Sequence, residues 1–191
     1  MTIPPPSPSS SLRAEFMAAI PNLRAFAMSL CGNATRADDL VQETLVKAWA
    51  KLGTFNEGTN LKAWLFTILR NIFFSEFRRR RREVEDADGV LSARLSVHPE
   101  QMGHMDFLDF RKALLTLPND QREALILVGA EGFSYEEAAA ISGCAVGTIK
   151  SRVNRARNRL TELLGVEGAS DYGPDGASVS VMGQGLQARS Q

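Results

Sequence analysis

The chain has 191 residues, of which 44% are hydrophobic, so it is long enough for one ordinary domain or two small ones with packed cores. It carries 22 basic and 22 acidic side chains, and this net charge of zero argues, as a sum, against a nucleic-acid-binding protein. No apolar run approaches the roughly 20 residues of a membrane-spanning helix, and the N-terminus lacks the apolar stretch of a secretory signal.

The residue types that usually hold metals or perform catalysis are few and scattered. Cys31 and Cys144 lie far apart, and His98 and His104 have no cysteine or acidic partner at a metal-binding spacing. No nucleophile–base pairing, catalytic carboxylate pair or phosphate-binding glycine loop is present in the sequence. We therefore expect a reduced, cytoplasmic protein that binds no metal or cofactor and is not an enzyme.

Composition divides the chain into two apolar-rich domains and three other segments. Residues 1–11 are rich in Pro and Ser, residues 83–104 are acidic at their start, and residues 165–191 are rich in Gly, Ser, Ala and Gln. We interpret these segments as a disordered leader, a flexible linker and a disordered tail. The domains between them are residues 12–82 and 105–164.

The first domain begins with two predicted helices, because strand signals are nearly absent and apolar residues recur at helical spacing. The first stretch covers residues 12–30, and its second half is expected to start at Pro21. Thr35 opens a capping-box-like pattern for a helix over residues 36–51, which Gly53 ends.

The helix over residues 36–51 has an apolar face and a mixed face. The apolar face consists of Ala37, Leu40, Val41, Thr44, Leu45, Ala48 and Leu52. The mixed face consists of Asp39, Gln42, Glu43, Val46 and Ala50. Exposed Val and Ala among carboxylates indicate a helical partner with a basic rim. An ordinary solvated face also fits, and periodicity alone favours it.

A third helix, predicted over residues 61–81 with Asn60 as its cap, is apolar over most of its surface. Only a narrow stripe with Thr67, Asn71 and Arg78 is polar, so the helix is expected to be mostly buried. Its aromatic residues are more typical of a core than of base stacking, although the preceding loop and the stripe could hold an unstacked base.

Four further helices are predicted in the second domain. Their ranges are residues 105–115, 118–130, 135–142 and 146–164. Ser134 and Glu137 form a capping box at the start of the third, and Gly143 permits a sharp turn into the fourth. This pattern is typical of a helix-turn-helix. The fold class is therefore all-α, with two small helical domains.

The zero net charge resolves into blocks along the chain. Residues 62–82 hold seven basic and one acidic side chain, and residues 148–162 hold five basic and one acidic. One basic helix in each domain indicates nucleic-acid contact far better than the sum does. For the arginines of residues 78–82 alone, a helix end stabilised by the helix dipole fits equally well.

Periodicity assigns the faces of the last helix. The predicted core face consists of Ile149, Val153, Ala156, Leu160 and Leu163. The outward face consists of Lys150, Ser151, Asn154, Arg155 and Asn158, flanked by Arg152, Arg157 and Arg159. The outward side chains suit base edges in a major groove, and the flanking arginines suit phosphates. The alternative is a solvated amphipathic helix, which the preceding cap and turn disfavour.

Four motifs carry a resemblance to a known family. Residues 38–44 (DDLVQET) and 63–71 (AWLFTILRN) resemble region 2 of bacterial sigma factors, and residues 117–124 (LPNDQREA) and 147–152 (GTIKSR) resemble region 4. Their order and short linker are similar to the extracytoplasmic-function (ECF) group, which has no region 3 domain. Within that group, the chain is similar to the general-stress-response members of alphaproteobacteria, which a small anti-sigma protein restrains.

The resemblance implies that the chain recruits core RNA polymerase to promoter DNA. It implies contact with the minus-thirty-five element by Lys150, Ser151, Arg152, Asn154 and Arg155. It implies contact with the minus-ten element, together with the loop over residues 53–60, by Lys62, Arg70, Asn71 and Arg78. It implies polymerase binding by Asp39, Gln42, Glu43 and Val46.

Two other functions are compatible with a sigma-like sequence. A sigma-like mimic would bind an anti-sigma factor and never DNA, but it should lack the outward basic residues. An ordinary repressor or activator would bind duplex DNA without polymerase, usually as a dimer.

Overall fold

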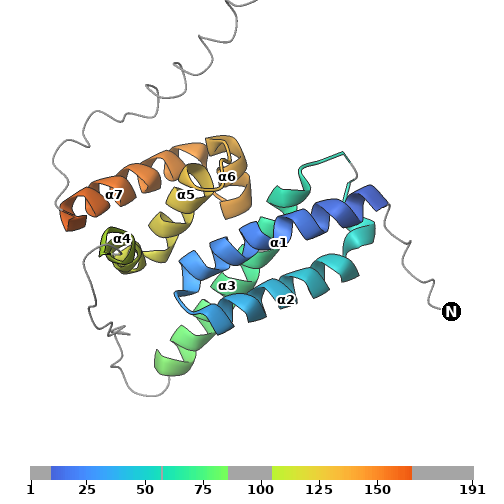
Figure 1. Cartoon of the computed structure of the whole chain (residues 1–191), viewed down its shortest axis with the longest axis horizontal. Helices are drawn as coiled ribbons and strands as arrows, with labels where there is room; N and C mark the ends of the chain where they lie inside the picture. The colour runs from blue at the N-terminus through green and yellow to red at the C-terminus, as the bar shows by residue number, and fades with distance from the viewer. Residues whose placement is uncertain (1–9, 57, 86–104, 165–191) are drawn as a thin grey trace, which may run out of the picture.

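The computed structural model describes residues 10–56, 58–85 and 105–164, which form α-helices and one short 3₁₀ helix, with no strand among them (Figure 1). The all-α prediction is confirmed. The elements are α1 (Ser10–Cys31), α2 (Ala34–Ala50), η1 (Leu52–Thr54), α3 (Leu61–Glu85), α4 (Met105–Thr116), α5 (Asn119–Gly129), α6 (Tyr135–Ser142) and α7 (Val146–Leu164). No helix in these ranges is long and apolar enough to cross a bilayer.

The predicted leader, linker and tail lie mostly outside the described residues. Two boundaries differ from the prediction: α1 already begins at Ser10, and α3 continues to Glu85. Both differences extend a helix beyond the limit that composition suggested, because helical periodicity fades near the ends of an element.

α1 runs without interruption through Pro21, where the second half of the predicted helical stretch was expected to start, so no new start occurs there. Proline removes one backbone hydrogen bond, which usually kinks or ends a helix. Here the apolar residues before and after Pro21 lie on one continuous buried face, from Phe16 to Phe26, while Pro21 itself is exposed. Packing of that face outweighs the local preference of proline.

Side-chain caps begin the next two helices. Asn33, and not Thr35, caps α2, because Gly32 has a left-handed φ of 70° that reverses the chain and leaves Asn33 extended. The Asn33 side chain accepts a hydrogen bond from the Arg36 N–H at 2.9 Å. α2 then ends at Ala50, and Gly53 lies in η1 and not at a helix end.

Asn60 caps α3 as predicted, since its Oδ1 accepts a hydrogen bond from the Ala63 N–H at 3.0 Å. α3 is mostly buried along its first half, where Phe66 stacks on Phe26 of α1 with ring centroids 4.8 Å apart. Arg24 and Asp38 pair at 2.6 Å between α1 and α2, and their hydrogen bond lowers the pKa of the exposed Asp38 carboxyl.

The helix-turn-helix prediction matches the geometry of α6 and α7. Ser134 and Glu137 form a reciprocal capping box, and Gly143 ends α6 with a φ of 64°. On α7, four of the five predicted core residues are buried. Leu163 is 41% exposed, so its assignment to the core is wrong. In the last turn of α7, Leu164 instead packs against a buried apolar cluster that includes Ala113 and Leu114 of α4.

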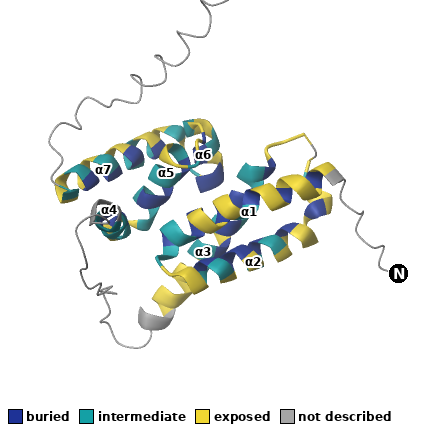
Figure 2. Ribbon diagram, viewed as in Figure 1, coloured by how far each residue is buried: buried dark blue, intermediate teal, exposed yellow. Residues whose placement is uncertain are grey.

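The two domains pack against each other, with α3 against α6 and α1 against α5. One cluster of buried apolar residues extends from α1–α3 into α5–α7, and Figure 2 shows buried segments on the facing sides of these helices. The Phe133 ring packs edge-on against the Phe66 ring, with the two ring centroids 5.2 Å apart. This packing decides which predicted DNA-binding side chains are accessible.

Candidate nucleic-acid and polymerase interfaces

The outward face of α7 gathers most of the predicted minus-thirty-five residues. Lys150, Asn154 and Arg155 are exposed, and Ser151 is half-buried. The Ser151 hydroxyl donates to the Thr148 carbonyl at 3.0 Å, and the Arg155 guanidinium donates to Ser151 Oγ at 3.4 Å. The face therefore presents two exposed cations and an amide on one helix.

Arg152 differs from its neighbours on α7. Its side chain is 23% exposed, and Nε lies 3.1 Å from the Asp120 carboxylate of α5. It also donates a hydrogen bond to Cys144 Sγ at 3.7 Å. In this conformation Arg152 ties α7 to α5 and the preceding turn, and it does not extend outward with Arg155.

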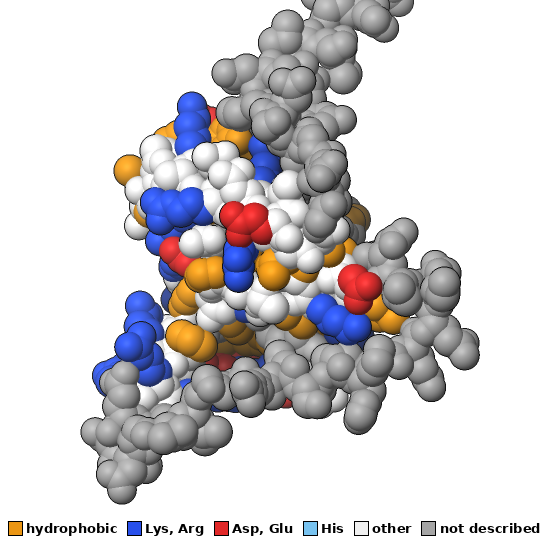
Figure 3. All heavy atoms as spheres, turned by 90° about the vertical axis from the view of Figure 1, so that its left-hand side faces the viewer, with side chains coloured by type: hydrophobic (Ala, Val, Ile, Leu, Met, Phe, Trp, Pro, Cys, Tyr) orange, Lys and Arg blue, Asp and Glu red, His pale blue; other side chains and the backbone are white. Residues whose placement is uncertain are grey.

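The predicted minus-ten residues of α3 divide into two pairs. Asn71 and Arg78 are exposed, and the Asn71 amide oxygen accepts a hydrogen bond from Arg70 at 3.3 Å. Lys62 and Arg70 are partly buried against the second domain. Figure 3 shows Lys and Arg side chains at several separate places on one face of the molecule.

Two carboxylates of the second domain meet these partly buried cations. Arg70 pairs with Glu123 at 2.7 Å, and Lys62 pairs with Glu131 at 3.0 Å. Glu123 is fully buried, and its Oε2 has no hydrogen-bond partner. Burial raises the pKa of Glu123, and Arg70 offsets part of this increase. Sequence reasoning missed both contacts, because nothing local to α3 reveals a carboxylate that arrives from another domain.

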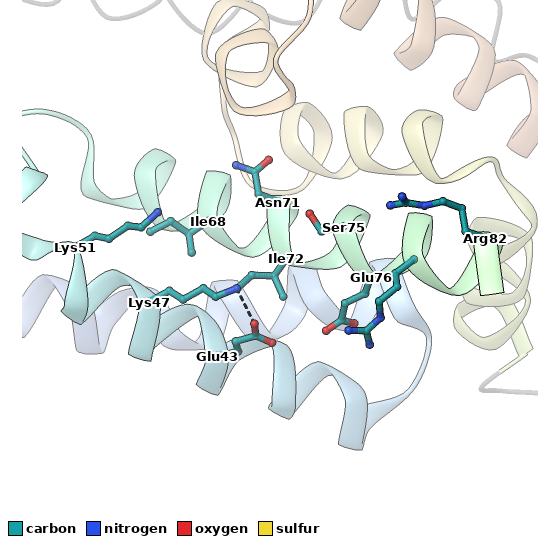
Figure 4. Close-up of a pocket in the computed structure, with 10 residues that line it drawn as sticks. Glu43, Lys47, Lys51, Ile68, Asn71, Ile72, Ser75, Glu76 and Arg82 are labelled. Atoms are coloured by element: carbon teal, nitrogen blue, oxygen red, sulfur yellow. Dashed lines mark ion pairs between the residues drawn. The ribbon is translucent and has the colours of Figure 1, made fainter.

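A groove of about 590 Å³ lies between α2 and α3, beside Asn71 (Figure 4). Lys47 and Lys51 line one side and Arg79 and Arg82 the other. Lys47 also pairs with Glu43 at 2.7 Å. The groove adds Lys47 and Lys51, which the charge pattern had not assigned to any interface, to the cations near Asn71.

The mixed face of α2 is accessible, as periodicity predicted. Asp39 and Gln42 are exposed, Glu43 is half-buried, and Val46 is 69% exposed. Trp49, one turn further along, is 47% exposed and was not singled out for this face. Two large apolar side chains among carboxylates form a surface that fits a protein better than it fits DNA.

No metal-binding cluster exists among the described residues, since no three His, Cys, Asp or Glu side chains there converge on one point. The interfaces described above contain cations, amides and apolar side chains. They are suited to binding macromolecules.

Comparison with known proteins agrees with this division into two regions. The Sigma-70 region 2 family matches residues 16–83, and the Sigma-70, region 4 family matches residues 107–160. An α-helical region 2 joined directly to a helix-turn-helix region 4 defines a sigma factor without the intervening region 3. The class implied by the sequence motifs is therefore confirmed.

Similarity to individual proteins places the chain in a narrower group of sigma factors. The chain is 64% identical over 175 residues to the ECF RNA polymerase sigma factor EcfG of Rhodopseudomonas palustris (strain TIE-1), covering 92% of this chain and 97% of EcfG. It is 59% identical to the sigma factor RpoE of Bartonella quintana, solved in complex with the anti-sigma factor NepR, with a TM-score of 0.74 over 84% of this chain and 100% of RpoE. The chain belongs to the ECF RNA polymerase sigma factors, which direct polymerase to promoters.

The sigma-like mimic expected as an alternative shares the fold only. The anti-anti-sigma factor PhyR of Bartonella quintana, solved with NepR, matches 79% of this chain with a TM-score of 0.53 but only 18% identity. This chain spans 49% of that PhyR chain. The much higher identity to proteins named as sigma factors assigns the chain to the sigma factors themselves.

Proposed function

We propose that this sigma factor contacts the minus-thirty-five element through the outward face of α7. The observation that carries the proposal is the exposed set of Lys150, Asn154 and Arg155 on the second helix of a capped helix-turn-helix. Arg and Lys bond guanine edges in the major groove, and Asn bonds adenine. Ser151 and Arg152 support the same surface, Ser151 through Arg155 and Arg152 by fixing α7 on α5.

Contact with the minus-ten element is assigned to α3 and the loop before it. Asn71 and Arg78 are exposed, and the groove beside Asn71 adds Lys47 and Lys51. Cations lining a groove suit the backbone of a single DNA strand, while an amide suits a base edge. Lys62 and Arg70 complete this surface once they are released from the second domain.

Core RNA polymerase is the proposed partner of the mixed face of α2. Asp39, Gln42, Glu43 and Val46 form the surface, and Trp49 extends it. Carboxylates at its edges steer a basic partner, and the exposed apolar side chains supply the buried centre that an interface needs. The chain acts in this role in the cytoplasm, without catalytic chemistry of its own.

An anti-sigma factor is the proposed regulator, in a stress response. Support comes from the RpoE–NepR complex, because RpoE matches this chain along both domains at 59% identity. Both domains are presented together in the packed conformation, so a small protein can contact region 2 and region 4 at once.

The direct test is promoter-specific transcription with core polymerase, combined with a footprint on the promoter. Arg155→Ala and Asn71→Ala should each lower initiation by about 5- to 150-fold, since one good base contact is worth about 1–3 kcal/mol. The footprint should weaken at minus thirty-five in the first variant and at minus ten in the second. Arg13→Ala, an exposed arginine of α1, is the matched control and should behave as wild type.

Unchanged initiation in Arg155→Ala and Asn71→Ala would disprove the proposed DNA contacts. The polymerase face is tested separately by binding of core enzyme to Val46→Glu. This variant should bind core polymerase at least tenfold more weakly, because it places a charge in the apolar centre of the interface.

A further inference from the structure

Two arginines of α7, Arg152 and Arg155, lie close together on the helix in different surroundings. Arg155 is exposed, and its guanidinium donates to Ser151 of the same helix at 3.4 Å. The Arg152 side chain is 23% exposed, and its guanidinium reaches two groups that lie outside α7. Arg155 is therefore carried by α7, whereas Arg152 joins α7 to its neighbours.

The two partners of Arg152 come from different parts of the helix-turn-helix region. Arg152 Nε lies 3.1 Å from the Asp120 carboxylate of α5, and a terminal nitrogen donates to Cys144 Sγ at 3.7 Å. Cys144 belongs to the turn between α6 and α7. Because the guanidinium is planar and rigid, these two contacts fix the direction of the whole group. It faces α5 and the turn.

Asp120 is well placed to act as the fixed member of the ion pair. It lies in the first turn of α5, where the helix dipole favours a carboxylate. α5 packs against α7, and the buried Leu127 of α5 shares an apolar cluster with Ile149 of α7. Asp has a short side chain on this anchored helix, so the longer side chain of Arg152 takes its position from Asp120.

An unpaired arginine at this position would add affinity without sequence information. Arg152 flanks the outward face of α7, where an arginine suits phosphates. Each phosphate contact strengthens binding to every sequence and makes binding more dependent on salt. The proposed base contacts of Lys150, Asn154 and Arg155 would then account for a smaller share of the binding.

From this geometry we infer that Asp120 is a positioning residue that sets the sequence discrimination of the minus-thirty-five surface. It acts through Arg152, because it keeps that guanidinium paired on the helix-turn-helix and away from phosphates. The inference rests on the proposed minus-thirty-five role of α7. It adds to that role a residue of α5 that does not itself touch DNA.

The experiment removes the charge of Asp120 and keeps its size, in the variant Asp120→Asn. The matched control is Asp109→Asn on α4, since Asp109 also pairs with a cation, Lys112, at 3.2 Å. The two carboxylates are 44% and 45% exposed, and each variant loses one negative charge. Asp120→Glu keeps the carboxylate and should behave as wild type.

Binding to non-specific DNA is measured by fluorescence anisotropy, with the full chain and a labelled duplex of random sequence. Asp120→Asn should bind about two- to fivefold more tightly than the control, which is the worth of one exposed ion pair. The plot of log affinity against log salt should become steeper by about 0.9, the value for one added phosphate contact. A purely structural role of Asp120 would not steepen this plot.

Sequence discrimination is measured with core polymerase present, by footprint titration on a promoter and on the same DNA with a scrambled minus-thirty-five element. The ratio of the two affinities should fall about two- to fivefold in Asp120→Asn. At the promoter the base contacts fix where α7 lies, whereas on scrambled DNA the helix can shift until the released Arg152 meets a phosphate.

The Arg152→Gln background decides whether Asp120 acts through the arginine. Asp120→Asn should have no further effect there, because its partner is already absent. A gain that persists in this background would overturn the inference, since the carboxylate would then repel DNA by itself. An unchanged salt dependence or an unchanged affinity ratio in Asp120→Asn alone would also overturn it.

Failure of the proposed function gives a different result. If Arg155→Ala keeps the full affinity ratio in the same footprint titration, the outward face of α7 does not read the minus-thirty-five element. If Arg155→Ala lowers the ratio and Asp120→Asn does not, the inference about Asp120 fails alone.

Discussion

The α3 face with Lys62 and Arg70 and the outward face of α7 carry the same kinds of side chain in opposite situations. Lys62 and Arg70 are paired with carboxylates of the other domain, whereas Lys150 and Arg155 are exposed on their own helix. Charge patterning identified both helices but did not separate them. The difference shows that whether a basic helix is available to DNA depends on what packs against it.

The largest expected effect is the loss of Arg70. Arg70→Ala should lower the free energy of unfolding by about 3–5 kcal/mol, because it leaves Glu123 buried without its partner. Arg155→Ala should change it by no more than about 0.5 kcal/mol, as is usual for an exposed side chain. Urea unfolding of both variants measures the contrast.

Replacing both members of the buried pair is the control. Arg70→Leu combined with Glu123→Leu should recover most of the lost stability, since neither charge is then buried alone. Equal losses for Arg70→Ala and Arg155→Ala would erase the distinction between the two faces.

The next largest effect is a pH dependence of stability that we expect from Glu123, the partner of Arg70 on α3. Burial raises the pKa of Glu123 above its ordinary value of 4.5. At a pH between the ordinary and the raised pKa, the folded chain therefore binds the proton more tightly than the unfolded chain. Stability from this group is therefore lost as pH rises through that window. Glu123→Gln has no carboxyl there and does not lose this stability. Its free energy of unfolding relative to wild type should therefore rise by about 1.4 kcal/mol for each unit by which burial raises the pKa of Glu123.

Urea unfolding of wild type and Glu123→Gln from pH 4.5 to neutral measures this dependence. The difference in unfolding free energy should move in favour of the variant as pH rises. Glu136→Gln, which replaces an exposed carboxylate of α6, is the matched control variant in the same measurement. A flat profile for Glu123→Gln would mean that burial does not control this carboxyl.

The predictions that succeeded depend on local sequence. Apolar spacing located every described α-helix, and the caps Asn60 and Ser134 act within four residues of their own position. The outward face of α7 followed from the same periodicity, since a helix surface is fixed by its own sequence.

The predictions that failed depend on distant groups. Pro21 stays helical because of the core beneath it, and Leu163 is exposed because α4 meets the end of α7 at Leu164. The ion pair of Arg152 with Asp120 of another helix, which leaves its predicted DNA contact untested, was likewise not visible in the sequence. None of these partners lies near enough in sequence for periodicity to reveal it.

A smaller effect is expected at the capping box that supports both faces. Glu137 accepts hydrogen bonds from the Ser134 N–H and from Asn60 of the first domain, and these bonds, led by that from Ser134, lower its pKa. Ser134→Ala should destabilise the chain by about 1 kcal/mol, as loss of an N-cap usually does. Ser134→Thr keeps a capping hydroxyl and should retain most of that stability in the same thermal unfolding measurement. Similar losses for both variants would contradict a capping role.

The smallest effect concerns the accessible face, where a weak contact orients a DNA-binding cation. Lys150 Nζ lies 5.5 Å from the centre of the Tyr135 ring, and such an exposed cation–π contact is worth about 0.5–1 kcal/mol. Tyr135→Leu should therefore weaken promoter binding by the polymerase complex about two- to fivefold in a footprint titration. Tyr135→Phe keeps the ring and should bind as wild type.

The Lys150→Ala background decides whether the ring acts through the lysine. Tyr135→Leu should have no further effect there, because its partner is already absent. A loss that persists in this background would show that Tyr135 contributes through the fold of α6 and not through Lys150. The expected outcome extends the comparison between the two helices: on α7 a single ring contacts one exposed cation, whereas on α3 both cations pair with carboxylates of the second domain.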